Sequence, residues 1–181
     1  PQFEPGIADI LKFRISKSSQ DYRFEMQFAN LVDPGWHEEY GYQLTYCAIG
    51  ISYDPNTGTA LIGKNAGSRF QNNFKADQIL YVSGGLLLVD ESLAPLAEYM
   101  PRRSQGAIGN TKTDMVSFHL PVDVFMGKLE NCSFQIAVGC QDDHGGAGIG
   151  DFRPVEALGG EWSGGGKVET ETSNVYDWLL W

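Results

Sequence analysis

Apolar and polar residues alternate with a period of two along much of the chain. The clearest example is segment 20–30, where every second residue is apolar and the residues between are polar or charged. The apolar positions are Tyr22, Phe24, Met26 and Phe28, and the polar positions are Arg23, Glu25 and Gln27. Successive side chains of a β-strand point to opposite faces, so this pattern predicts a strand with one buried face.

The same alternation predicts a second strand over residues 42–52. One face carries Tyr42, Leu44, Tyr46 and Ala48, and the other carries Gln43, Thr45, Cys47, Ile49 and Ile51. A turn at 54–58 followed by residues 60–63 predicts a hairpin. Further strands are expected at 7–15, 78–83, 85–90, 113–120 and 132–140, and residues 176–181 are expected to form a final strand that packs on the core.

Helical patterns are short in this sequence. The candidates are segment 90–96, which Pro95 interrupts, and segment 121–126, where Pro121 suits a first helical turn. Many short strands separated by Gly, Pro and Asn turns are typical of an antiparallel sandwich. We therefore expect an all-β, jelly-roll-like sandwich with one or two short helical turns, formed by residues 1–181 as a single domain.

The charge of the chain restricts its partners. The 181 residues include 13 Lys and Arg against 23 Asp and Glu, for a net charge of −10. Nucleic-acid binding needs clustered basic residues, and no basic run exceeds Arg102-Arg103, so no nucleic-acid partner is expected. No apolar stretch approaches the roughly 20 residues that cross a bilayer, so membrane insertion is not expected either. The acidic excess favours cations such as calcium, or else forms only a solvated surface.

The three cysteines are Cys47, Cys132 and Cys140, and none has the spacing of a zinc or c-type haem site. Cys132 and Cys140 lie on one predicted strand, too far apart to bridge each other. Any disulfide would therefore include Cys47. The alternative is that all three are small buried hydrophobic residues.

Aspartates and glycines are concentrated in segment 141–155. Its glycines resemble a phosphate-binding loop, but Phe152-Arg153-Pro154 breaks the helix that a dinucleotide site requires. Asp142, Asp143 and Asp151 provide the hard oxygen ligands that calcium prefers, and the glycines let backbone carbonyls turn inward, so we expect a calcium site here. The alternative is a polar turn closed by aspartate hydrogen bonds.

The sequence contains no recognisable catalytic motif. His37, His119 and His144 are scattered without zinc-site spacing, and no G-x-S-x-G elbow occurs. The adjacent acidic pairs Glu38-Glu39 and Asp142-Asp143 point to opposite faces of a strand, which does not place two carboxylates across one cleft. We therefore expect a protein that is not an enzyme.

Aromatic residues gather at the predicted strand ends. Trp36, Tyr40 and Tyr42 are close in sequence, and Trp162 lies in a glycine-rich turn. Sugar rings stack their C–H faces on flat aromatic side chains while amides and carboxylates bind the hydroxyls, so these four residues are predicted to bind carbohydrate. The alternative is that the aromatic side chains only plug the ends of the sandwich.

The last third of the chain contains a distinctive series of short motifs. They are Val138-Gly139-Cys140-Gln141-Asp142, Gly145, Arg153-Pro154-Val155, Trp162 and Gly164-Gly165-Gly166. With these residues the chain resembles the C-terminal module of glucodextranase-like enzymes. Segments 8–13, 20–30 and 41–44 are similar more loosely. The resemblance implies a β-sandwich related to family 9 carbohydrate-binding modules and DOMON domains, which binds polysaccharide or cell wall and in some relatives carries calcium.

Three functions follow as hypotheses. The first is a non-catalytic, secreted module that binds polysaccharide or cell-wall glycan, with structural calcium; the start at Pro1 without methionine fits a processed or excised chain. The second is a self-assembling cell-surface protein, a homo-oligomer or polymer such as a filament, sheath or S-layer subunit, with calcium-dependent contacts. The third is a b-type haem domain of the DOMON kind, with axial ligands drawn from His144, Met26, Met100 and Met115.

Overall fold

The computed structural model describes residues 3–35, 37–100, 106–146, 148–160, 163–168 and 173–181. Within these residues the smaller sheet contains β1 (Ile10–Lys17), β2 (Asp21–Phe28), β7 (Gly109–Asn110) and β8 (Met115–Pro121). The larger sheet contains β3 (Thr45–Ser52), β4 (Gln78–Val82), β5 (Leu86–Asp90), β6 (Pro95–Tyr99), β9 (Ser133–Asp142), β10 (Asp151–Phe152) and β11 (Val175–Leu180). Three 3-10 turns are η1 (Glu38–Tyr40), η3 (Val122–Val124) and η4 (Leu129–Asn131).

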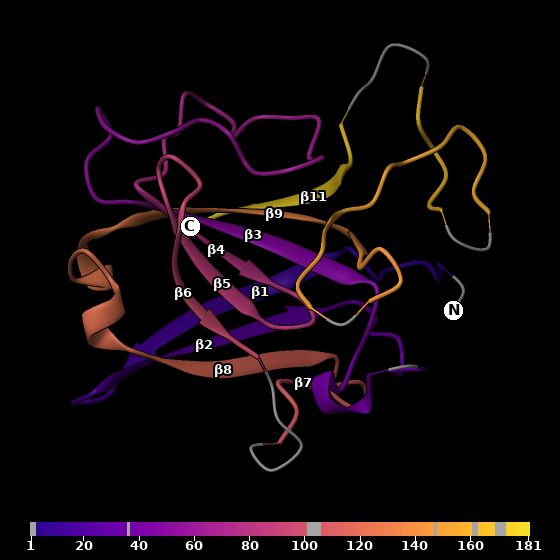
Figure 1. Ribbon diagram of the computed structural model, residues 1–181, viewed down its shortest axis with the longest axis horizontal. Helices are drawn as coiled ribbons and strands as arrows, with labels where there is room; N and C mark the ends of the chain where they lie inside the picture. The colour runs from indigo at the N-terminus through magenta and orange to yellow at the C-terminus, as the bar shows by residue number, and fades with distance from the viewer. Residues whose placement is uncertain (1–2, 36, 101–105, 147, 161–162, 169–172) are drawn as a thin grey trace.

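The two sheets pack face to face (Figure 1). The smaller sheet has the order β1-β2-β8-β7, and the larger has the order β10-β9-β3-β4-β5-β6, with β11 also paired to β9. The pairings are antiparallel throughout the named strands. The expected all-β sandwich is therefore confirmed, and in the described part of the chain no helix is long and apolar enough to cross a membrane.

Segment 20–30 contains the strand β2, which has one buried face, as the alternation predicts. Tyr22, Phe24, Met26 and Phe28 on β2 are at most 2% exposed and belong to the core between the sheets. The ring of Phe24 stacks on Phe118 of β8, with 5.1 Å between ring centroids. Burial of such large aromatic side chains is the main favourable contribution to the stability of this core.

The central strands of the larger sheet are buried on both faces. Every residue of β3 is buried, with Cys47, Ile49 and Ile51 in the core between the sheets. On the outer face, Tyr46 and Ala48 belong to a second core, to which residues of the connection 53–77 and of segment 149–152 also contribute (Figure 1). The predicted grouping of Tyr42 and Leu44 with Tyr46 is wrong, because Leu44 adopts a φ of 70° that interrupts the alternation and leaves both residues in the inter-sheet core.

Segment 90–96 forms a hairpin turn instead of the predicted short helix. The Asp90 carboxylate accepts hydrogen bonds from the backbone N–H groups of Ser92 and Ala94 at 2.8 and 3.0 Å, and Leu93 has a φ of 66°. The aspartate therefore closes a turn rather than capping a helix. Pro95 then begins β6, the edge strand of the larger sheet, where its missing N–H is tolerated.

The predicted hairpin at 60–63 is also wrong. The partners of β3 are β4 and β9, and segment 60–63 makes only an isolated bridge, between Leu61 and Arg69. By contrast, segment 121–126 contains the 3-10 turn η3, as its proline predicted.

All three cysteines are free. Cys47 and Cys140 are buried in the core between the sheets, as the alternative to a disulfide predicted, and Cys132 is half-buried. Burial raises the pKa of the Cys140 thiol to about 12 and that of Cys132 to about 11. These thiols remain protonated at neutral pH and are poor nucleophiles.

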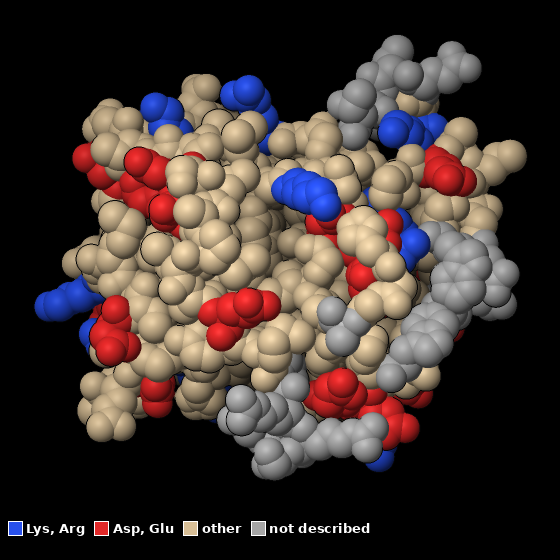
Figure 2. All heavy atoms as spheres, viewed as in Figure 1, with Lys and Arg blue, Asp and Glu red and all other residues tan. Residues whose placement is uncertain are grey.

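The charged side chains are interspersed on the face of the molecule shown in Figure 2. Basic and acidic groups lie next to one another near its centre, where a shallow hollow is also visible. Local electrostatics therefore depends on individual charge pairs more than on the net charge.

Candidate functional site

An open cleft of about 610 Å³ lies where β9 ends and the loops that follow β2 and β9 come together. We call it the β9 cleft. It is lined mainly by polar and aromatic side chains. These residues are His37, Tyr40, Gln43, Leu44, Gln141, Asp142, Asp143, His144, Gly145 and Arg153.

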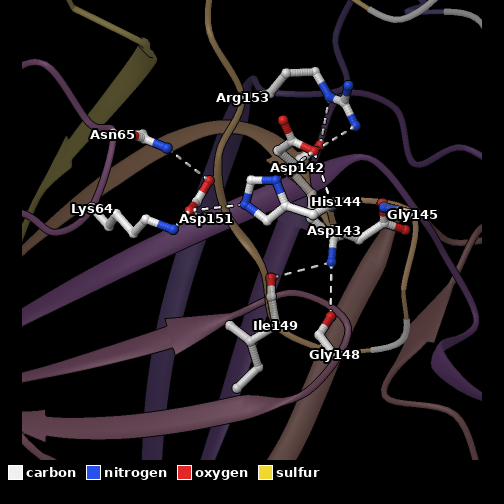
Figure 3. Close-up of polar contacts among 11 residues, drawn as sticks. Lys64, Asn65, Asp142, Asp143, His144, Gly145, Gly148, Ile149, Asp151 and Arg153 are labelled. Carbon is white, nitrogen blue, oxygen red and sulfur yellow. Dashed lines mark hydrogen bonds and ion pairs between the residues drawn. The ribbon is translucent and has the colours of Figure 1, made fainter.

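Gln141 holds the loop that forms one wall of the β9 cleft. Its side chain is nearly buried, and its Nε2 donates hydrogen bonds to the carbonyl oxygens of Gly148 and Ile149 at 3.0 and 3.2 Å (Figure 3). The loop closes tightly where β10 pairs with β9, and Gly150 there has a φ of +67°. A Cβ at Gly150 would overlap the Asp142 carbonyl, so only glycine fits this position without strain.

A buried carboxylate anchors the base of the same loop. Asp151 is 4% exposed and contacts Lys64 Nζ at 2.8 Å, His144 Nε2 at 3.1 Å and Asn65 Nδ2 at 3.2 Å (Figure 3). Burial by itself would raise the pKa of Asp151, but the hydrogen bonds to these three side chains outweigh it and the pKa is lowered. Asp151 is therefore an ionised structural anchor between the loop and segment 64–65.

The other two predicted calcium ligands have separate partners. Asp142 Oδ1 accepts a hydrogen bond from the His144 backbone at 3.0 Å and lies 3.5 Å from Arg153 Nη2, and Asp143 Oδ1 accepts one from Gly145 at 2.9 Å. Among the described residues no group of three or more His, Cys, Asp or Glu side chains is arranged to hold a metal ion. Calcium at Asp142, Asp143 and Asp151 thus stays a prediction, and it requires Lys64 and His144 to move away from Asp151.

An aromatic pair lies on the other side of the β9 cleft. The rings of His37 and Tyr40 are 5.0 Å apart and tilted by 32°. Tyr40 is 4% exposed, and its hydroxyl accepts a hydrogen bond from the Gly148 N–H at 3.2 Å, so it ties η1 to the loop after β9. Burial raises the pKa of Tyr40, so its hydroxyl remains protonated at neutral pH. The half-buried His37 ring lies over this rigid tyrosine.

The predicted carbohydrate-binding residues do not all meet. Tyr40 lines the β9 cleft, whereas Tyr42 is 2% exposed and donates its hydroxyl hydrogen bond to the Ser83 carbonyl inside the core at 3.0 Å. Tyr42 is therefore a core side chain that fills one end of the sandwich, which was the alternative to carbohydrate binding for these aromatic residues. Trp36 and Trp162 lie outside the described residues.

Sequence reasoning did not single out His37 and Gln43, both of which line the β9 cleft. The sequence offers His37 only as a scattered histidine without zinc-site spacing, although it flanks the predicted aromatic cluster. Gln43 Oε1 accepts a hydrogen bond from the Gly35 N–H at 2.8 Å, which fixes the side chain at the cleft wall. The available signal was the mixture of ring side chains with two carboxylates and one amide over residues 36–43, which a strand pattern alone does not reveal.

The fold and the cleft define a class of protein. A β-sandwich with an open cleft of aromatic, amide and carboxylate side chains, carried on loops at one end of the sheets, is the arrangement of a binding module. The family of the C-terminal, SLH-like binding module of glucodextranase matches residues 1–181, and the chain belongs to this family. No curated protein shows significant similarity to the chain.

Proposed function

We propose that this chain is a non-catalytic extracellular or cell-surface module that binds polysaccharide or cell-wall glycan in the β9 cleft. The observation that carries the proposal is the His37–Tyr40 ring pair facing a loop of fixed carboxylates and amides. Membership in a family of binding modules supports it.

The geometry suits a sugar ring. The half-buried His37 ring can stack on the apolar C–H face of a sugar, while its rigid neighbour Tyr40 limits the entropy lost on binding. Asp142 and Asp143 each use Oδ1 in the loop, and within the described residues their Oδ2 atoms have no hydrogen-bond partner. Those oxygens are available to accept hydrogen bonds from sugar hydroxyls.

The same contacts argue for binding rather than catalysis. Hydrolysis of a glycosidic bond needs one carboxyl group that can be protonated and a second one across the scissile bond. The pKa of Asp151 is lowered, and this carboxylate is held by Lys64 and His144. It is therefore poorly suited to act as a general acid.

Affinity electrophoresis on α-glucans, β-glucans and cell-wall polymers tests the proposal. We expect at least one polymer to retard the protein, and His37→Ala to abolish most of the retardation. His119→Ala is the matched control, because His119 is an exposed histidine on β8 in the other sheet. No retardation by any polymer, or equal retardation of the two variants, would overturn the proposal.

Self-assembly is a second candidate function. The strand β6 forms the edge of the larger sheet, and its Leu96 side chain is 50% exposed. Unpaired edge strands accept strands from neighbouring molecules. Size-exclusion chromatography in calcium and in EDTA tests this candidate: assembly that EDTA reverses supports it, and a monomer in both conditions rules it out.

The haem hypothesis has weaker support. Met26 is fully buried in the core between the sheets, whereas His144 lies on the exposed loop after β9, hydrogen-bonded to Asp151. Met100 directly follows β6, and Met115 is the first residue of β8. An absorption spectrum of the purified protein reconstituted with haem decides this point, since a bound b-type haem gives a Soret band.

A further inference from the structure

A second cleft of about 590 Å³ lies beside the first. We call it the β11 cleft. It is formed by the segment before β1, the start of β11 and the glycine-rich turn at 164–165. Its chemically distinctive lining residues are Phe3, Glu4, Asp9, Cys140, Tyr176 and Asp177.

The two clefts adjoin at Arg153. Arg153 lines the β9 cleft, and its guanidinium carbon lies 5.9 Å from the centroid of the Phe3 ring, which lines the β11 cleft. Figure 1 shows the N-terminal segment and the loops after β9 at the same end of the sandwich. A chain-like ligand can therefore extend from one cleft to the other.

The glycine-rich turn positions an aromatic ring at the β11 cleft. Tyr176 is 42% exposed, and its hydroxyl donates a hydrogen bond to the Gly165 carbonyl at 3.3 Å. A Cβ at Gly164 would overlap the Tyr176 hydroxyl, so the glycine allows the ring to lie close to the turn. The glycine cluster, one of the most distinctive features of the sequence, thus fixes a surface aromatic side chain.

The β11 cleft has the chemistry of a sugar subsite. Phe3 and Tyr176 provide two accessible rings, and the exposed side chains of Glu4 and Asp9 provide carboxylate acceptors. Among its described lining residues there is no Lys, Arg or His, and the cation at its border, Arg153, lies 3.5 Å from the Asp142 carboxylate. An acidic lining whose bordering cation is already paired with a carboxylate favours neutral or amine-bearing sugars over anionic ones.

We infer that the β11 cleft is a further subsite for the same glycan chain that occupies the β9 cleft, and that it selects neutral or amino sugars. This inference rests on the proposed function. Filling a second, linked subsite raises affinity without changing the first, because the second binding event is intramolecular. Long oligosaccharides therefore bind more tightly than short ones.

Calorimetric titration with short and long oligosaccharides tests the inference. The probes are α-1,4- and β-1,4-linked gluco-oligosaccharides and chitosan oligosaccharides of about two and about eight units, with oligogalacturonate as the anionic comparison. For the wild type we expect the longer oligosaccharide to bind at least about tenfold more tightly than the shorter one. For Tyr176→Ala we expect this gain to fall below about threefold, while the affinity for the disaccharide stays that of the wild type. Tyr176→Phe is the control, since it keeps the ring and should keep most of the gain.

The possible results separate the two proposals. A wild-type protein that binds none of the probes or polymers overturns both. A wild type that binds short and long chains equally, a length gain that survives in Tyr176→Ala, or tighter binding of oligogalacturonate overturns only the β11 subsite. If thermal unfolding shows that Tyr176→Ala is misfolded, Asp9→Lys replaces it, because Asp9 is an exposed acid at this cleft and the same loss of length gain is expected.

Discussion

At the scale of single residues, hydrogen bonds from a buried hydroxyl and from a lysine at a strand end hold one carboxylate, Glu130, in its ionised form. Glu130 accepts hydrogen bonds from the buried Tyr22 hydroxyl and from Lys17 Nζ, the latter at 2.9 Å. The hydrogen bond from Tyr22, followed by that from Lys17, lowers the pKa of Glu130 to about 2. Because the Tyr22 hydroxyl also accepts the Leu129 N–H at 3.1 Å, this one carboxylate connects β1, β2 and η4.

Glu130→Gln should destabilise the protein in a pH-dependent way. A carboxylate whose pKa is lower in the folded state stabilises the fold above its ordinary pKa of 4.5, and this contribution is lost as the pH falls toward 2. We therefore expect a lower Tm for the variant at pH 7, and a difference that shrinks between about pH 4.5 and pH 2. Thermal unfolding followed by circular dichroism measures it, with Glu91→Gln in the exposed turn after β5 as control. A difference that does not change with pH would contradict the assignment.

Calcium binding at Asp151 depends on the two basic side chains that contact this carboxylate. Since Lys64 and His144 contact Asp151, they must be displaced before a cation can bind there. If the site binds calcium, Lys64→Gln should lower the calcium concentration that raises the Tm, because a competing positive charge has been removed. The measurement is thermal unfolding over a calcium titration, with Lys75→Gln as the matched lysine control. Unchanged Tm values for wild type and Lys64→Gln at all calcium concentrations would show that the calcium prediction is wrong.

At the scale of elements, the sequence predicted strands with strong alternation and missed those that depend on tertiary contacts. Strands β1, β2, β3, β4, β5, β8, β9 and β11 overlap segments that the sequence predicts as strands, and β2 also shows its buried face as predicted. The two-residue strands β7 and β10 have no periodic signal and exist only because neighbouring strands hold them. The prediction of a short helix at 90–96 is wrong because an aspartate such as Asp90 can either cap a helix or close a hairpin turn, and the sequence does not distinguish the two.

The candidate site was predictable only in part. Tyr40 and the loop 141–151 were identified from residue type, because aromatic rings and aspartates carry a chemical signal wherever they lie. The contact between Asp151 and Lys64 joins segments that are distant in sequence, and the pairing of His37 with Tyr40 depends on the 3-10 turn η1, which the sequence pattern does not predict. Single-sequence patterns contain no information on such contacts. The left-handed conformation of Leu44, which moves Tyr42 into the core, was likewise invisible in the alternation.

The loop after β9 yields a prediction at this scale. Gly150→Ala places a Cβ against the Asp142 carbonyl at a positive φ, whereas Gly106→Ala at φ +80° meets no atom within 4 Å and lies outside both clefts. We expect Gly106→Ala to cost only the backbone term of about 1–2 kcal/mol, and Gly150→Ala to cost more and to weaken glycan binding by displacing Asp142 and Asp143. Urea unfolding and affinity electrophoresis measure the two effects. Equal losses in the two variants would show that the loop adapts at Gly150.

At the scale of the whole molecule, the larger sheet separates two hydrophobic cores. The inner core lies between the sheets and includes Phe24, and the outer core lies under the long connections and includes Phe152, which is packed at 4.7 Å from the ring of Tyr46. Both side chains are fully buried. Because β3 and β9 contribute residues to both cores, the connections that form the β9 and β11 clefts are packed onto the same sheet that supports the sandwich.

This shared sheet predicts cooperative unfolding of the sandwich and its binding loops. Phe24→Ala and Phe152→Ala each remove a buried ring, and each should cost about 3–5 kcal/mol. If the two cores unfold together, both variants retain a single transition with an unchanged m-value in urea, detected alike by tryptophan fluorescence and by far-UV circular dichroism. A Phe152→Ala variant that shows a separate early transition would instead mean that the outer connections unfold on their own. The connections that line the clefts would then unfold before the rest of the sandwich. In that case ligand binding would raise the midpoint of the early transition and leave that of the main transition unchanged.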